Sequence, residues 1–387
     1  MYKRILQINL PAKQSAFLWG ARKTGKSTYL KQNFPNSIYY DFLKSDEFLR
    51  YSKAPHKLRE EILALDVERK EQPIIIDEVQ KVPQILDEVH WLIENANVSF
   101  ILCGSSARKL KRSGTNLLGG RAWKYHFFPL TYNEITDFSL IQVLKNGCIP
   151  SHYKTINIKK SFKSYVEDYL VHEIKAEGLV RNLPGFARFL DVMPFSNGEM
   201  INFANIARDC AIDAKTVKEY FNILEDTLLG YFIYPYSKKV KRDLIIAQPK
   251  FYLFDVGLAT YLSKNSFEDT EGSEAGRALE NYILQEIIAY NSMKELDYKI
   301  NYWRTKTGLE VDFLINSKIA IEVKISNNIH VSHLNGIKAL SEEIKLDKAI
   351  IVCLETKERI IKHRNGVIHI LHVENFLKKL WLGSIFN

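Results

Sequence analysis

Glycines, a lysine and a hydroxyl residue stand at the spacing GxxxxGK[ST] in the segment SAFLWGARKTGKSTYLKQNF. The segment opens with a short apolar run typical of a strand and continues with a pattern typical of a helix. A glycine-rich turn in that context lets successive backbone N–H groups face a phosphate chain, and the following helix N-terminus favours anions. We expect Lys26 to reach the β- and γ-phosphates of a nucleotide and the Ser27 hydroxyl to bind Mg²⁺. The predicted nucleotide-binding residues are Gly20, Ala21, Arg22, Lys23, Thr24, Gly25, Lys26, Ser27 and Thr28.

A nucleotide-hydrolysing site of this kind needs acids from a second strand, and the segment QPIIIDEVQKVP supplies two of them. Three isoleucines predict a buried strand that ends in Asp77 and Glu78. We expect Asp77 to support Mg²⁺ and Glu78 to orient and polarise the attacking water. A further strand, VSFILCGSS, ends in Ser105 and Ser106, one of which could contact the γ-phosphate or the water. No guanine-reading [NT]KxD motif follows, which favours ATP. The alternative is that these segments are ordinary strand-to-helix turns.

A basic, glycine-containing loop, ARKLKRSGTNLLGGRAWKYHFFPL, follows this strand. Its Arg121 could act as an arginine finger that supplies positive charge to the transition state in a neighbouring subunit. That role would require a homo-oligomer. The alternative is that Arg121 caps or pairs within its own loop.

Acids and a lysine interrupt two apolar runs in GLEVDFLINSKIAIEVK, which predicts two strands joined by a tight turn. The side-chain period of a strand is two, so Glu322 and Lys324 point the same way, and Asp312 can lie beside them on the neighbouring strand. Oxygen ligands suit Mg²⁺, and Lys324 could orient a nucleophilic water. Glu280, on the amphipathic helix SEAGRALENYILQEIIAY, could complete the metal shell through a water. The alternatives are a salt-bridged pair of Glu322 and Lys324, or a site that only binds.

The segment EMINFANIARDCAIDAKTVKEYFNILEDTLLGYFIYPY predicts a helix, a turn, a second helix and a strand, in the order of a winged helix-turn-helix. Lys215 and Lys218 lie on the face of the second helix that could meet DNA. The run SKKVKRD adds basic groups for phosphate contacts, namely Lys238, Lys239, Lys241 and Arg242. A spacer or a protein-docking module would show the same pattern.

These segments belong to a chain of 387 residues, long enough for two or three domains. Its net charge of +9 favours a polyanionic partner. The four cysteines have no CxxC spacing, which predicts a reduced, cytoplasmic compartment. The N-terminus lacks the apolar core of a signal peptide, and no run of about 18 apolar residues predicts a membrane-spanning helix.

Together these motifs predict an α/β protein with three parts. Residues 1–145 form a P-loop domain with a parallel sheet, residues 146–248 a helical linker with the winged helix-turn-helix, and residues 249–387 an α/β domain that carries the acids and Lys324.

Over nearly its full length the chain resembles the prokaryotic AAA-type ATP-binding proteins that have an N-terminal AAA_14 domain and a C-terminal DUF4143 domain. The resemblance lies in GARKTGKST, PIIIDEVQKVPQIL, GSSARKL, LLGGRAWKYHFFPLTYNEI, KFYLFDVGLATYL, GRALENYI, GLEVDFLI and IAIEVK, which follow the order of the family. It implies an AAA/ASCE fold with P-loop and Walker B roles for the residues above and a sensor role for Ser105. It also implies a restriction-endonuclease-like, PD-(D/E)xK fold marked by Glu280, Asp312, Glu322 and Lys324. Ala21 and Lys23 depart from the proline and glutamine that are frequent in the family.

Two functions fit these observations. In the first, a P-loop ATPase is coupled to a DNA-binding, Mg²⁺-dependent nuclease domain. In the second, ATP gates a protein that binds nucleic acid or another protein, and the nuclease-like domain is catalytically silent.

Overall fold

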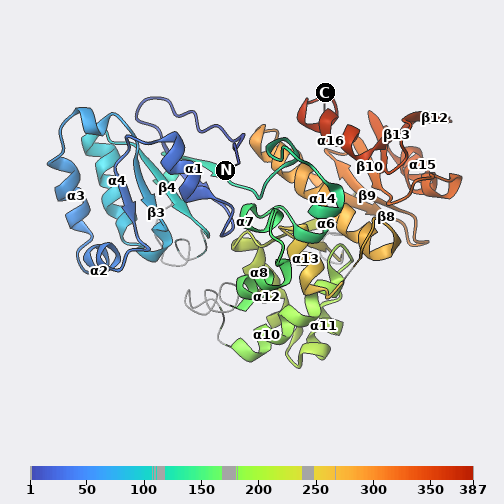
Figure 1. The fold of residues 1–387 in the computed structure, drawn as a ribbon, viewed down its shortest axis with the longest axis horizontal. Coiled ribbons are helices and arrows are strands. Elements are labelled where there is room, and N and C mark those ends of the chain that lie inside the picture. The colour runs from blue at the N-terminus through green and yellow to red at the C-terminus, as the bar shows by residue number, and fades with distance from the viewer. Residues whose placement is uncertain are drawn as a thin grey trace. The chain divides into compact units, whose positions relative to one another are not determined.

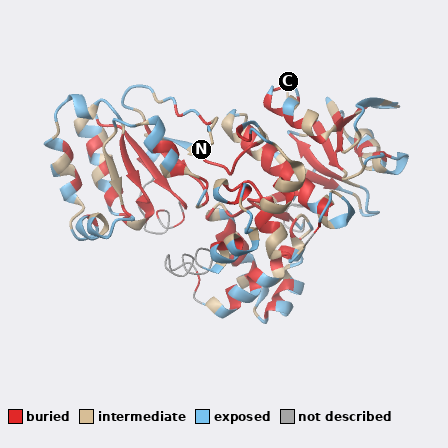
Figure 2. Cartoon of the chain, viewed as in Figure 1, coloured by how far each residue is buried: buried red, intermediate tan, exposed pale blue. Residues whose placement is uncertain are grey.

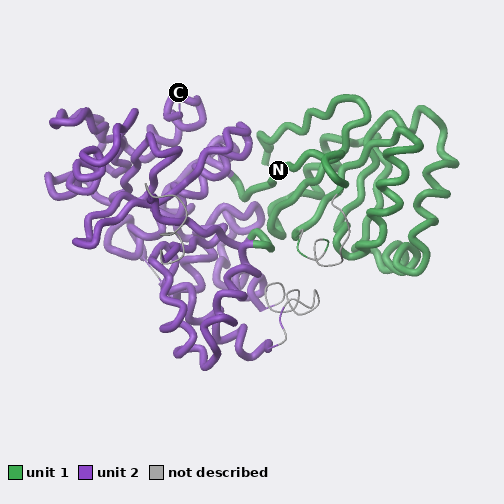
Figure 3. The backbone as a smooth tube through the Cα atoms, turned by 180° about the vertical axis from the view of Figure 1, so that it is seen from behind, with its two compact units in different colours: residues 1–130, 226–228 green, residues 131–225, 229–387 purple. Residues whose placement is uncertain are grey.

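The computed structural model describes residues 2–106, 108, 110, 118–167, 180, 182–237, 248–265 and 267–386. It separates into two compact units: unit 1 comprises residues 1–130 and 226–228, and unit 2 residues 131–225 and 229–387 (Figure 3). A parallel sheet, a helical middle and a C-terminal sheet follow one another along the chain (Figure 1). The predicted α/β class is confirmed at this level, while the boundaries at 145/146 and 248/249 stay predictions.

Unit 1 is a five-stranded parallel sheet with helices on both sides (Figure 1). The strands are β1 (Ser15–Trp19), β2 (Tyr39–Asp41), β3 (Ile74–Asp77), β4 (Phe100–Gly104) and β5 (Ala122–His126). The α-helices that the structure describes here are α1 (Lys26–Asn33), α2 (Ser45–Lys53), α3 (His56–Leu63) and α4 (Ile85–Ala96), and the short 3₁₀ turns are η1 (Glu68–Lys70), η2 (Val79–Lys81) and η3 (Leu118–Gly120).

The strand order of unit 1 is β2-β3-β4-β1-β5. Strand β4 therefore lies between β1, which leads into the glycine-rich turn, and β3, which ends at Asp77. Alternate positions on these strands, such as Phe17, Ile76 and Leu102, pack with α3 and α4 in one apolar core (Figure 2). Because all strands are parallel, their carboxyl ends meet at one edge of the sheet, where ligands of open α/β sheets bind.

The first half of unit 2 is helical. The helices that the structure describes in this part are α6 (Leu140–Asn146), α7 (Pro150–Tyr153), α8 (Ile158–Ser164), α10 (Leu183–Val192), α11 (Phe203–Cys210), α12 (Ala214–Asp226) and α13 (Val256–Leu262), and the 3₁₀ turns are η4 (Tyr132–Glu134) and η6 (Met193–Ser196). The last residue of α12 is the first residue of the short segment assigned to unit 1. Asn202 caps α11, and Asp213 accepts a hydrogen bond from Thr216 N at the start of α12. The expected helix, turn, helix and strand are present, and their assignment as a winged helix stays a prediction.

The second half of unit 2 is built on an eight-stranded mixed sheet of order β12-β13-β11-β10-β9-β8-β6-β7. The strands are β6 (Gly230–Pro235), β7 (Lys250–Leu253), β8 (Ile300–Arg304), β9 (Glu310–Ile315), β10 (Ile319–Val323), β11 (Lys348–Cys353), β12 (Arg359–His363) and β13 (Gly366–His372). The helices are α14 (Gly272–Met293), α15 (Asn335–Glu343) and α16 (Val373–Trp381), with the 3₁₀ turn η8 (Val331–Leu334). Strand β6 thus pairs with β7 and with β8, so the sheet begins inside the segment predicted as the middle domain.

Helices α6 and α13 pack closely because two glycines let their backbones approach. Asp255 caps α13, and its carboxylate accepts hydrogen bonds from Leu258 N at 3.0 Å and Cys148 N at 2.7 Å. A Cβ atom on Gly257 would lie 2.2 Å from the backbone nitrogen of Gly147. Glycine is therefore required at position 257 by a backbone contact.

Gly257→Ala is expected to lower the free energy of unfolding by about 3 kcal/mol, because the added methyl meets backbone atoms that cannot move aside as a side chain would. Gly276→Ala in α14 is the matched control, since its Cβ would meet only a side-chain carbon of Ile325 at 3.3 Å. Alanine also favours a helix. Urea denaturation of both variants tests this, and equal stability of the two would contradict it.

The four cysteines, Cys103, Cys148, Cys210 and Cys353, are buried and free. Among the described residues, no helix has the length and apolar character needed to cross a membrane.

Candidate functional site

The glycine-rich turn predicted from the sequence joins β1 to α1 in unit 1. A Cβ on Gly20 would lie 2.3 Å from the carbonyl oxygen of Phe127, and Gly25 has a φ of 97°. Both positions therefore require glycine, the first through a close backbone approach and the second through a left-handed conformation. Thr24 Oγ1 donates to the carbonyl of Ala21 at 2.8 Å and closes the turn.

Lys26, the first residue of α1, folds its side chain back over the turn. Its Nζ donates to the carbonyl oxygens of Gly20 at 2.7 Å and Ala21 at 3.0 Å, and the side chain is buried. The ammonium therefore lies within the curve of the turn, as a lysine that binds phosphates must. Of the other predicted contacts, Arg22 is half-buried, whereas Lys23 and Thr28 are exposed.

Arg4 holds this turn from outside the predicted motif. Its guanidinium donates to the carbonyls of Thr24 at 2.6 Å and Phe128 at 2.7 Å, and it stacks over the Phe127 ring at 4.1 Å. The partners lie far away in sequence, so no local pattern predicted the role of Arg4.

Ser27 and Asp77 meet, as the sequence predicted. Ser27 Oγ donates to Asp77 Oδ2 at 2.6 Å, and the hydroxyl of Tyr39 on β2 donates to the same oxygen at 2.5 Å. Burial raises the pKa of Tyr39, and the nearby Asp77 carboxylate raises it further. Hydroxyl and carboxylate oxygens are the donors that Mg²⁺ prefers, so this pair fits the ion.

Glu78 and Ser105 are joined by Gln80, a residue to which the sequence reasoning gave no role. Gln80 Nε2 donates to Glu78 Oε2 and, at 3.1 Å, to Ser105 Oγ. Glu78 has a φ of 56°, a conformation that L-residues other than asparagine and aspartate seldom adopt. A strained backbone at a sheet edge is a common feature of functional sites. In the sequence, the one sign of a role for Gln80 was its place in the motif DEVQ, two positions after Glu78.

Arg121 lies just before the edge strand β5 and is partly exposed. Its Nε forms an ion pair with Glu94 near the end of α4, within the same unit. Glu94 lies outside the loop of Arg121, so this ion pair is not the pairing within the loop that was the alternative, and the arginine-finger role stays a prediction.

The hairpin of β9 and β10 in unit 2 carries the second group of predicted residues. Its turn residues, Asn316 and Ser317, both have positive φ, and Lys318 N donates to the carbonyl of Ile315 at 3.0 Å, which closes a tight turn. The register pairs Phe313 with Ile321, and continued by one residue it sets Asp312 opposite Glu322. The predicted strands, turn and neighbouring acids are therefore all present.

Asp312, Glu322 and Lys324 come together on this hairpin. Lys324 Nζ lies 2.6 Å from Glu322 Oε1, and Asp312 Oδ2 accepts from Val323 N at 2.8 Å. Burial and then the nearby Glu280 charge raise the pKa of Asp312 above its ordinary value. Burial and the adjacent Asp312 raise the pKa of Glu322 in the same way. Ionising both of these buried carboxyl groups is unfavourable, because each lies in a low-dielectric environment beside the other. A cation bound between them would offset their negative charges and would therefore be stabilised there.

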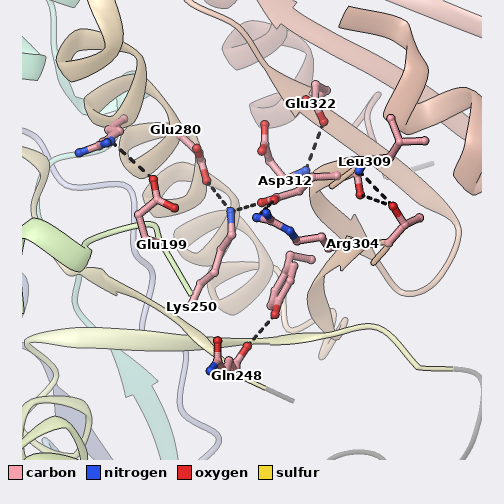
Figure 4. Close-up of polar contacts among 12 residues, drawn as sticks. Glu199, Gln248, Lys250, Glu280, Arg304, Leu309, Asp312 and Glu322 are labelled. Atoms are coloured by element: carbon pink, nitrogen blue, oxygen red, sulfur yellow. Dashed lines mark hydrogen bonds and ion pairs between the residues drawn. The ribbon is translucent and has the colours of Figure 1, made fainter. Parts of the chain in front are cut away.

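Glu280 projects from α14 toward a lysine that the sequence reasoning missed (Figure 4). Its Oε1 accepts from the hydroxyl of Tyr252 at 2.5 Å and lies 3.4 Å from Lys250 Nζ. Lys250 and Tyr252 both lie on β7, which is far from the hairpin in sequence.

The residues predicted to hold metal therefore lie in two places: Ser27 with Asp77 in unit 1, and Asp312 with Glu322 in unit 2. Glu280, also in unit 2, has its carboxylate against Lys250 and Tyr252. In the part of the chain that the structure describes, no three His, Cys, Asp or Glu side chains form a ready metal-binding group. A cation at either place would thus complete its shell with waters or phosphate oxygens, which is usual for Mg²⁺.

Of the residues predicted to meet DNA, Lys215 and Lys218 are exposed on α12. The basic run Lys238, Lys239, Lys241 and Arg242 lies outside the described residues.

Comparison with known families gives three consecutive matches. Residues 12–136 match an AAA domain (AAA_14), residues 138–269 a domain of unknown function (DUF8612), and residues 275–375 a second domain of unknown function (DUF4143). The expected architecture of an N-terminal AAA domain and a C-terminal DUF4143 domain is therefore confirmed.

Two proteins of Methanocaldococcus jannaschii are similar to the chain along most of its length. Uncharacterized protein MJ1637 is 24% identical over 415 residues, which span 89% of this chain and 82% of the relative. Uncharacterized protein MJ1544 is 23% identical over 384 residues, which span 88% and 81%. A solved structure, the STAND protein with a tetratricopeptide repeat sensor PH0952 from Pyrococcus horikoshii, aligns at 11% identity over 76% of this chain and 50% of its own, with a TM-score of 0.19. That score is too low to carry an argument.

Proposed function

From a chain that carries an AAA-type ATP-binding domain and a C-terminal DUF4143 domain, we propose a protein that hydrolyses ATP in unit 1 and thereby controls a metal-dependent nuclease that acts on DNA in unit 2. The observation that carries the first half is the hydrogen bond of 2.6 Å between Ser27 and Asp77, beside the buried ammonium of Lys26. The convergence of Asp312, Glu322 and Lys324 supports the second half.

In unit 1 the proposed roles follow from the contacts. The backbone of the glycine-rich turn and Lys26 bind the phosphates, and Ser27 and Asp77 hold Mg²⁺, which neutralises phosphate charge when it is bound. Glu78 orients the attacking water. Ser105 contacts the γ-phosphate or this water and is positioned through Gln80.

In unit 2, Asp312 and Glu322 would hold a divalent cation, with Glu280 contributing through a water. The cation would polarise a phosphodiester, while Lys324 would orient the nucleophilic water and offset charge. The exposed Lys215 and Lys218 would contact DNA phosphates, and a contact of this kind weakens as salt rises. The proposal includes a cytoplasmic location and allows a homo-oligomer in which Arg121 serves a neighbouring subunit.

One observation favours the alternative, an ATP-gated binding protein with a silent nuclease-like domain. Lys324 already pairs with Glu322, and Lys250 with Glu280. The carboxylates therefore have internal partners, which lowers their need for a metal ion.

Asp312→Asn is expected to abolish Mg²⁺- or Mn²⁺-dependent DNA cleavage, because the variant loses a charged oxygen ligand but keeps the size of the side chain. Linear, nicked and single-stranded DNA should be tested with and without ATP. Glu342→Gln, an exposed change on α15, is the control and should cleave as the unmodified protein does.

Cleavage that survives in the Asp312→Asn protein would contradict the nuclease proposal and indicate a contaminating enzyme. ATP-dependent DNA binding without any cleavage by the unmodified protein would instead support the silent binding domain.

A further inference from the structure

Lys250 is a buried lysine among the carboxylates of unit 2. Its side chain is only 4% exposed, and its Nζ lies 2.5 Å from Glu310 Oε1 and 3.4 Å from Glu280 Oε1. The ammonium also lies 5.5 Å from the centre of the Tyr302 ring. The charge thus sits where α14 and β9 bring their acids together.

Both carboxylates around Lys250 are fixed by further partners. The Tyr252 hydroxyl donates to Glu280 Oε1 at 2.5 Å, and Arg304 Nη1 lies 2.7 Å from Glu310 Oε2. Asp312 follows Glu310 by two positions on β9, so the two side chains lie on the same face of the sheet. These contacts therefore fix the position of the Lys250 ammonium. The group of charges around it adjoins the cluster of Asp312 and Glu322.

A buried ammonium is stable only where charges compensate for its lost hydration. Burial alone would lower the pKa of Lys250, but Glu280, Asp312 and Glu310 act against it, and the net change is upward. Lys250 is therefore charged throughout the physiological range. It places one fixed positive charge among acids that would otherwise attract a free cation.

The four acids of this region, Glu280, Glu310, Asp312 and Glu322, thus divide into two pairs. Glu280 and Glu310 hold Lys250. Asp312 and Glu322 face each other across the hairpin, where Asp312 N donates to Glu322 Oε2 at 3.4 Å, and Lys324 pairs with Glu322 at 2.6 Å.

We propose that Lys250 determines how many cations this site takes: its ammonium stands in the place of a second divalent cation, so that unit 2 binds one such ion, at Asp312 and Glu322, and not two. The inference rests on the proposed metal site. It adds that the side-chain ammonium of Lys250 supplies part of the positive charge that a second metal ion supplies in two-metal sites.

The test is the number of Mn²⁺ ions bound per chain, measured by isothermal titration calorimetry without nucleotide, so that Mn²⁺ is not carried to unit 1 by ATP. The unmodified protein is expected to bind one ion, and Asp312→Asn to bind none. Lys250→Met and Lys250→Gln, which remove the charge, are expected to bind a second ion or to bind the first at least about tenfold more tightly. Lys250→Arg keeps the charge and should match the unmodified protein.

Four outcomes separate this inference from the proposed function. If Lys250→Met and Lys250→Gln, shown to be folded by circular dichroism, bind Mn²⁺ as the unmodified protein does, the role of Lys250 is overturned and the Asp312 site stands. Two ions in the unmodified protein, both lost in Asp312→Asn, would overturn it equally, whether or not the lysine variants fold. Mn²⁺ binding that is seen only when Lys250 is replaced would support the proposal that the Lys250 ammonium takes the place of a cation. It would also overturn the metal site proposed for the unmodified protein. Absence of binding in every protein would overturn both.

Discussion

Lys26→Ala is expected to lower the affinity for ATP by about 100-fold or more. Lys26 Nζ is buried in the curve of the glycine-rich turn, held by two backbone carbonyls at 2.7 and 3.0 Å. Phosphate oxygens would replace these carbonyls as acceptors of the Lys26 hydrogen bonds. Because the phosphate oxygens are negatively charged, each hydrogen bond would then join two charged groups. A hydrogen bond between charged groups contributes up to about 3 kcal/mol, which corresponds to about a hundredfold in a dissociation constant.

Equilibrium binding of a fluorescent ATP analogue in the presence of Mg²⁺ measures this loss. Lys53→Ala, an exposed change at the end of α2, is the control for the loss of one positive charge and should bind as the unmodified protein does. Retained affinity in the Lys26→Ala protein would show that the nucleotide binds elsewhere.

Glu78→Gln is expected to slow ATP hydrolysis by about 10²- to 10⁴-fold while ATP binding is kept, because the variant loses the carboxylate that polarises water but keeps the shape of the side chain. Glu78 directly follows Asp77, whose oxygen accepts from the Ser27 hydroxyl, so it lies beside the proposed Mg²⁺ position. The variant should therefore accumulate a protein with ATP bound.

Release of phosphate and retention of radiolabelled ATP should be measured on the same Glu78→Gln sample. Glu60→Gln, exposed on α3, is the control and should leave both unchanged. Hydrolysis at the normal rate in the Glu78→Gln protein would assign the water-activating role to another residue.

The nucleotide site could be predicted from the sequence because its main parts are local. The turn between β1 and α1 carries its glycines and Lys26 within eight consecutive positions, and the isoleucines before Asp77 mark a buried strand whose end must lie at the sheet edge. Gln80 also lies in the predicted segment, but only the fold brings it to Ser105, 25 positions along the chain.

The acids of unit 2 were predictable for a similar reason, since the tight turn that contains Asn316 and Ser317 fixes the register of the hairpin. Lys250 was not predictable, because β7 reaches the hairpin only through β6 and β8 in the sheet order. The role of Arg4 at the glycine-rich turn was not predictable for the same reason, because its acceptor, the carbonyl of Phe128, lies 124 residues away. Contacts between strands distant in sequence depend on topology, which local patterns do not encode.

Phosphate release from ATP by the purified protein with Mg²⁺ decides whether unit 1 hydrolyses ATP at the proposed residues. Steady release is expected, which stops when Mg²⁺ is chelated and is lost in both the Lys26→Ala and Glu78→Gln proteins. Absence of release from the unmodified protein, with and without DNA, or release that persists unchanged in both variants, would contradict ATP hydrolysis at these residues.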